Sequence, residues 1–154
     1  IRHEGAHQLM FTYGIHSPNR IENEWLVEGL ASYCEASSIG DYDPVRAVLL
    51  KKALADGTAI PLRNLVNFRN VRGLTAIGSA ERAEMAYHES WALVHWLMQY
   101  EQQSRFFEYI RYVRNMDNYR QVRKTPAYDL LCHMMQLDPA EFENLWKQHI
   151  QNLP

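Results

Sequence analysis

Apolar residues recur at helical spacing along almost the whole chain, and this pattern constrains the fold more than any other feature of the sequence. The strongest stretch spans residues 80–102, where Met85, Trp91 and Val94 lie on or near one stripe. No segment alternates apolar and polar residues in the way that a half-buried strand does. We therefore expect a mainly α fold that forms a single domain over residues 1–154.

Turn and capping residues divide this pattern into separate helices. The pair Asp43-Pro44 predicts a helix start, because an aspartate caps the first turn and proline suits its first position. The pair Asp56-Gly57 predicts the end of the same helix. Helices are expected over 1–13, 23–35, 43–55, 80–102, 104–115, 126–135 and 139–150, with one short helix allowed after Pro61. Residues 1–57 then carry the candidate metal ligands, and a connection over 58–78 leads to a helical C-terminal part, 80–154.

Composition and charge limit the classes of partner. Apolar residues make up 47% of the chain and charged residues 22%, values typical of an ordinary globular protein. The net charge of -2 gives no electrostatic reason to expect nucleic acid or an anionic membrane as a partner. Apolar runs of only a few residues argue against membrane insertion. We expect a monomer that binds neither.

The chain start and the cysteines carry two further expectations. The sequence begins at Ile1 without an initiator methionine, which predicts a fragment of a longer precursor whose targeting segment lies upstream. Cys34 and Cys132 both lie in apolar helical contexts, and two cysteines in a domain of this size do not form a disulfide framework. We expect both to be free thiols that pack as small apolar residues.

Residues 3–9, HEGAHQL, contain an arrangement typical of a zinc site. On a helix, His3 and His7 lie one turn apart on the same face, so both imidazoles can reach one ion. Glu4 projects about 100 degrees around the helix from His3, where it can take a proton from metal-activated water. Two surface histidines and a solvated glutamate are the alternative interpretation. A third ligand decides between the two.

The segment NEWLVEGLASYCE, residues 23–35, offers that third ligand. Glu28 stands within an apolar run, where a carboxylate is costly unless it is paired or bound to a metal. Two histidines and one glutamate are a common ligand set for catalytic zinc, and they leave a fourth position open. Gly29 has a low helix propensity and indicates close approach by another backbone or group. An exposed residue or a salt bridge to an arginine is the alternative role for Glu28.

These two motifs, HEGAH and WLVEGLASY, resemble those of the gluzincin clan of zinc metallopeptidases. The second motif is most similar to that of the zinc aminopeptidases, which reads Trp-Leu-x-Glu-Gly-Phe-Ala, and the pair also resembles the bacterial peptidase MA-like domains. The resemblance implies that His3, His7 and Glu28 bind Zn²⁺ and that Glu4 is the general base for hydrolysis of a peptide or protein substrate. It also implies a zincin-like catalytic domain of which this chain is the helical part, with its small β-sheet upstream.

A weaker resemblance covers residues 86–97, AYHESWALVHWL. This segment is similar to the aminopeptidase sequence Tyr-x-Lys-Gly followed by an apolar helix, although Glu89-Ser90 stands in place of Lys-Gly. The resemblance implies that Tyr87 donates a hydrogen bond to the developing oxyanion. A tyrosine that packs at helix spacing from Trp91 and Val94 is the alternative. The upstream motif with which aminopeptidases hold the substrate amino group is not found in this chain, so exopeptidase specificity does not carry over.

Other polar and aromatic side chains receive simpler expectations. Glu35 and Ser32 follow Glu28 on its helix and are candidates to orient a ligating histidine, although a solvated Glu35 is equally compatible with the pattern. We expect His16 to be exposed and His95 to be a buried, hydrogen-bonded histidine. An aromatic set is predicted to form packing core: Trp91, Trp96, Phe106, Phe107, Tyr109 and Tyr112.

Two functional alternatives stand beside the metallopeptidase. The chain could be a non-catalytic helical interaction domain that keeps zinc as a structural element or has lost it. It could also keep zinc and hydrolyse a bond other than a peptide bond. A Glu4→Gln variant separates an enzyme from a structural site, because only the enzyme would keep its zinc and lose turnover.

Overall fold

The computed structural model describes residues 2–16, 24–67, 80–99, 101, 103–115 and 126–154. These residues form helices and connecting segments, and none of them lies in a strand. The helices are α1 (Arg2–Thr12), α2 (Glu24–Tyr33), α3 (Pro44–Asp56), α4 (Leu62–Asn67), α6 (Ala80–Gln99), α7 (Gln103–Asn115), α8 (Ala127–Met135) and α9 (Pro139–Asn152). The predicted mainly α class is confirmed, and the expected helix bounds differ from these by only a few residues.

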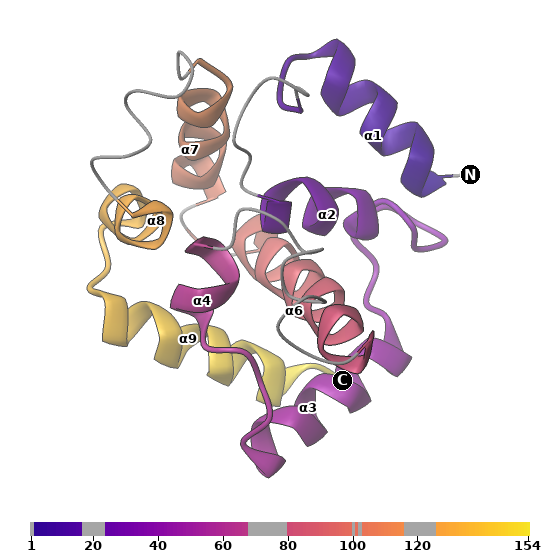
Figure 1. Ribbon diagram of the computed structural model, residues 1–154, viewed down its shortest axis with the longest axis vertical. Coiled ribbons are helices and arrows are strands. Elements are labelled where there is room, and N and C mark those ends of the chain that lie inside the picture. The colour runs from indigo at the N-terminus through magenta and orange to yellow at the C-terminus, as the bar shows by residue number, and fades with distance from the viewer. Residues whose placement is uncertain (1, 17–23, 68–79, 100, 102, 116–125) are drawn as a thin grey trace.

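Helix α6 lies at the centre of the fold, and the other helices surround it (Figure 1). It contacts α2, α3, α4, α7 and α9, while α8 packs against α4, α7 and α9. Helix α1 lies on the outer side of α2 and packs mainly against that helix. The HEGAH motif on α1 therefore packs mainly against one helix, α2. The WLVEGLASY motif on α2 is packed between α1 on one side and α6 on the other.

The main core gathers large side chains from most of the helices. Trp25 of α2, Trp91 of α6 and Trp146 of α9 are each 1% exposed within it. The predicted aromatic core is confirmed for Trp91, Trp96, Phe106 and Tyr109. It is wrong for Phe107 and Tyr112, which are exposed because they lie beside the inward stripe of α7 rather than on it.

Helix α3 begins and ends as its capping residues predict. The Asp43 carboxylate accepts hydrogen bonds from the backbone N–H groups of Val45 and Arg46, at 2.9 and 3.0 Å. Gly57 follows the last turn with φ 69°, a left-handed conformation that glycine adopts without steric cost. Both predicted bounds are confirmed.

Helices α2 and α6 approach so closely at Gly29 that this position has no room for a side chain. A Cβ atom added to Gly29 would lie 2.5 Å from the backbone oxygen of Ser90 and 2.6 Å from Cγ2 of Val94. The close approach predicted from this mid-helix glycine is confirmed. This contact determines how closely α2 packs against α6 and therefore where Glu28, the residue before Gly29, lies.

Both cysteines are free thiols, as expected. Cys132 is buried in the main core, and burial raises its pKa to about 11. Cys34 is half-buried at the end of α2, and burial raises its pKa as well. Both thiols therefore stay protonated near neutral pH, which suits packing rather than nucleophilic chemistry.

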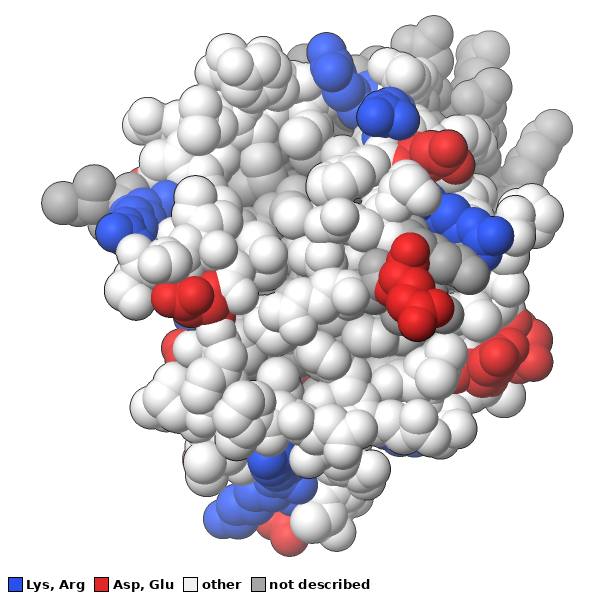
Figure 2. Space-filling view, turned by 180° about the vertical axis from the view of Figure 1, so that it is seen from behind, with Lys and Arg blue, Asp and Glu red and all other residues white. Residues whose placement is uncertain are grey.

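Charged side chains are mixed on the face shown in Figure 2. The described Lys and Arg residues there are interspersed with Asp and Glu, and neither sign gathers into a broad patch on that face. This mixture agrees with the net charge of -2. Within the described part of the chain, no helix has both the length and the apolar character that crossing a membrane requires.

Candidate metal centre

Helix α1 turns one stripe of residues toward α2, and both motif histidines lie on it. Helical spacing places His3 and His7 on the same side as two buried apolar residues of α1. The contact is formed by Ala6 and Met10 of α1 with Val27 and Ala31 of α2. This small cluster therefore holds the two imidazoles over α2, where Glu28 lies one position after Val27.

The three predicted ligands meet at one point. The Nε2 atoms of His3 and His7 are 3.0 Å apart, and Oε2 of Glu28 lies 3.4 Å from the first and 3.5 Å from the second. Zinc binds nitrogen and oxygen at about 2.0–2.1 Å in tetrahedral sites, which separates neighbouring ligand atoms by about 3.3 Å. The triangle of donor atoms therefore matches one face of a zinc tetrahedron.

The ligand set is partly open to solvent. The side chains of His3, His7 and Glu28 are 25%, 20% and 16% exposed. Among the described residues, no fourth His, Cys, Asp or Glu joins this group. Three protein donors would leave a fourth position for water on a bound zinc ion, whereas structural zinc sites are closed by four donors.

Glu35 contacts the outer nitrogen of a predicted ligand. Nδ1 of His3 lies 2.7 Å from Oε1 of Glu35. The contact has the length of an ion pair, but its direction does not make a hydrogen bond. A carboxylate in this place is the usual outer neighbour of a metal-binding histidine whose Nε2 faces the metal. Of the two candidates for this role, Glu35 makes the contact, and Ser32 is a buried residue of α2.

The two predicted catalytic residues lie on different helices. Glu4 follows His3 on α1 and is exposed. Tyr87 lies on α6, is half-buried and packs against the main core. It precedes Ser90 by three residues, so it shares the side of α6 that meets α2 at Gly29. The roles of Glu4 and Tyr87 stay predictions.

His16 is half-buried, so the expectation that it is exposed is wrong. The backbone N–H groups of Ile15 and His16 both donate to the carbonyl of Met10, at 2.8 and 3.1 Å. These bonds turn the chain back along α1, and the ring of His16 then lies 6.1 Å from that of His7. The sequence of the loop did not indicate that the chain turns back toward α1, because this turn depends on the two bonds to Met10.

Comparison with known proteins places the chain in a family. Residues 1–120 match the family model described as "Protein of unknown function (DUF1570)". The chain belongs to this family. The match to DUF1570 contains all five predicted site residues and the whole of α6. No curated protein and no solved structure matches the chain.

A second histidine pair lies away from the metal centre. Nδ1 of His95 is 3.1 Å from Nε2 of His149, and the amide nitrogen of Gln99 is 2.9 Å from Nε2 of His95. His95 is inside the DUF1570 match and His149 is outside it. Burial, together with the neighbouring His95, lowers the pKa of His149 to about 4. The expectation of a buried, hydrogen-bonded His95 is confirmed, while its partner carried no motif.

Glu89 carries a buried carboxyl group, and the sequence analysis did not predict this burial. Its side chain is fully buried on α6, and Oε1 accepts a hydrogen bond from the backbone N–H of Ile60 at 2.7 Å. Its Oε2 atom has no hydrogen-bond partner among the described residues. Burial outweighs the bond from Ile60 and the charge of Arg82, and raises the pKa of Glu89 to about 8.

We expect Glu89→Gln to change how stability depends on pH. The carboxyl stays protonated in the folded chain at neutral pH but ionises in the unfolded chain, so the free energy of unfolding falls as pH rises from about 5 to 8. Glutamine cannot ionise, so between pH 5 and pH 8 the free energy of unfolding of the variant should rise by about 3 kcal/mol relative to that of the unsubstituted chain. Urea unfolding at several pH values measures the difference. The exposed Glu108→Gln is the control, and parallel curves for Glu89→Gln and the unsubstituted chain would contradict the prediction.

Proposed function

We propose that this chain is a zinc-dependent metallopeptidase domain in which His3, His7 and Glu28 hold the metal and Glu4 is the general base. The observation that carries the proposal is the triangle of ligand atoms, with sides of 3.0, 3.4 and 3.5 Å. Two histidines with a carboxylate are a set that suits zinc. The contact of Glu35 with the outer nitrogen of His3 adds the carboxylate that such a histidine usually has.

The residues around the site can divide the work of hydrolysis. Zinc held there supplies a Lewis acid and activates water near neutral pH. Glu4, next to His3 and exposed, would take a proton from the attacking water and return it to the leaving amine. Tyr87 would donate a hydrogen bond to the developing oxyanion, a contribution of about 3 kcal/mol in comparable sites.

The proposal includes a relationship to the zincin-like catalytic domains. In such a domain a small β-sheet lies beside the helix that carries the two histidines. Helix α1 packs on α2 along one stripe, whereas Leu9, Phe11 and Tyr13 on and just after it are 60%, 56% and 60% exposed. This exposed apolar surface supports the proposal, because a further layer would bury it.

The test is a comparison of Glu4→Gln with the unsubstituted chain. We expect both proteins to bind about one zinc per chain, and the variant to cleave peptides about 10²- to 10⁴-fold more slowly, since the general base is lost and the ligands are kept. Metal analysis and a library of quenched fluorescent peptides measure the two quantities.

The exposed Glu108→Gln serves as a control and should match the unsubstituted chain. Zinc binding with equal turnover in Glu4→Gln would remove Glu4 from the mechanism. Zinc binding without peptide cleavage by any of the three proteins would favour the alternative of a helical interaction domain with structural zinc.

A further inference from the structure

Glu35 is held from two sides, one of which leads away from the metal centre. Its Oε1 atom faces Nδ1 of His3, and its Oε2 atom pairs with Nη2 of Arg46. Glu35 lies just after the end of α2 and its side chain is 36% exposed, so the helix itself does not orient it. Its two charged contacts therefore determine where the carboxylate points.

Arg46 is fixed by its own surroundings on α3. Its Nε atom lies 3.4 Å from Oδ2 of Asp43, the same residue that caps the first turn of α3. Its guanidinium carbon lies 5.8 Å from the ring centre of Trp91, which is fully buried on α6. The Arg46 side chain is 16% exposed. An acidic cap and an aromatic ring thus anchor the guanidinium to the main core.

We infer that Arg46 is a positioning residue for the metal centre, and the inference rests on the proposed zinc site. The guanidinium holds one oxygen of Glu35, so that the other oxygen stays beside Nδ1 of His3 and the Nε2 atom of His3 stays turned toward the point where His7 and Glu28 would share the metal. Helix α1 is otherwise attached by a small apolar cluster with α2 and by hydrogen bonds that the Arg2 guanidinium donates to the carbonyls of Ala36 and Ser37. Through Glu35, Arg46 ties His3 to the main core of the protein.

Zinc affinity is the quantity that this arrangement controls. We expect Arg46→Met to weaken zinc binding about 10-fold, at the lower end of what loss of an outer partner costs, and Glu35→Gln to weaken it by 10-fold or somewhat more. Arg46→Lys should recover part of the loss, because it keeps the charge but not the planar fork. In the Glu35→Gln background, Arg46→Met should add almost nothing, because the two residues act in series.

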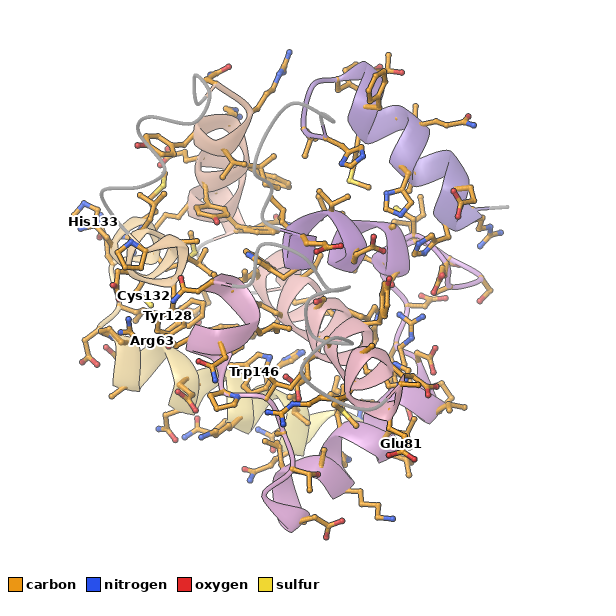
Figure 3. The ribbon with its side chains drawn as sticks, in the orientation of Figure 1. Arg63, Glu81, Tyr128, Cys132, His133 and Trp146 are labelled. Carbon is orange, nitrogen blue, oxygen red and sulfur yellow. The ribbon has the colours of Figure 1, made fainter. Side chains whose placement is uncertain are left out.

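Arg63→Met is the matched control. Nη2 of Arg63 lies 2.9 Å from Oδ1 of Asp129, and its guanidinium carbon lies 5.0 Å from the ring centre of Tyr128. Arg63 thus combines an ion pair with an aromatic ring as Arg46 does, but its side chain is 49% exposed against 16% for Arg46. Figure 3 shows Arg63 beside Tyr128, well apart from α1. We expect its substitution to leave zinc affinity unchanged, even if it lowers thermal stability.

The experiment is competition for zinc with a chromophoric chelator, together with thermal unfolding of each metal-free variant. An additive double variant, or equal zinc affinity in Arg46→Met and the unsubstituted chain, would overturn the role of Arg46 while leaving the zinc site intact. Failure of the unsubstituted chain to bind zinc would overturn the proposed function and this inference together. If Arg46→Met does not fold, Arg46→Lys alone should still bind zinc more weakly than the unsubstituted chain, and equal affinity would overturn the inference.

Discussion

Replacing Glu28 by alanine should abolish stoichiometric zinc binding. Its carboxylate supplies one corner of the donor triangle, at 3.4 and 3.5 Å from the two histidine nitrogens. The remaining histidine pair would offer only two donors, so we expect affinity to fall by more than the 10- to 100-fold that loss of an outer partner costs, to about 1,000-fold or more. Metal analysis of the purified chain after dialysis against a weak chelator measures the change.

Glu24→Ala is the control for this prediction, because Glu24 lies one turn earlier on α2 and is not a member of the ligand group. It should retain about one zinc per chain, and the circular dichroism of both variants should stay helical. Equal zinc content in Glu28→Ala and the unsubstituted chain would exclude the three-ligand site. Hydrolytic activity should disappear together with the metal.

Adding a single methyl group at Gly29 should destabilise the fold strongly. The new Cβ would meet the backbone oxygen of Ser90 at 2.5 Å, and a backbone atom in the middle of α6 cannot move aside alone. Overpacking costs about 1–3 kcal/mol, and a contact with backbone places this case near 3 kcal/mol, above the gain of about 1 kcal/mol from better helix propensity. We expect Gly29→Ala to lose about 2 kcal/mol net and to unfold about 4–8 °C lower.

Gly5→Ala is the matched control, since it makes the same change in the middle of another helix. Among the described residues, no atom outside the neighbouring backbone of α1 lies within 4 Å of a Cβ added at Gly5. The variant should therefore be stabilised by up to about 1 kcal/mol. Calorimetry of both variants separates the effects. Equal melting temperatures for Gly29→Ala and Gly5→Ala would contradict the prediction, because they would show that α2 and α6 can move apart at little cost in free energy.

The capped helices of this fold could be predicted because their signals are local. Asp43-Pro44 and Gly57 bound α3 as expected, since a cap involves atoms only a few residues apart. The same holds for the spacing of His3 and His7, which depends on one turn of one helix. Gly29 was also informative, because a glycine inside an apolar helix needs a reason to be there.

The errors and omissions involve contacts between segments far apart in the sequence. His95 and His149 belong to α6 and α9, 54 positions apart, and neither helix alone indicates the pair. His16 was expected in solvent because the turn that brings it back toward His7 depends on two bonds to Met10. Phe107 and Tyr112 were counted as core because aromatic character was considered without the orientation of α7.

The candidate metal centre shows which features the sequence determined and which depended on the tertiary structure. By itself, the sequence determined the helices, the two histidines on one face of α1 and a glutamate within the apolar run of α2. Only the tertiary structure decided that Nε2 of His3 lies 3.4 Å from Oε2 of Glu28 and that Glu35 reaches both His3 and Arg46. The physical reason is that periodicity and capping act within a few residues, whereas distances between side chains of different helices depend on how closely those helices pack.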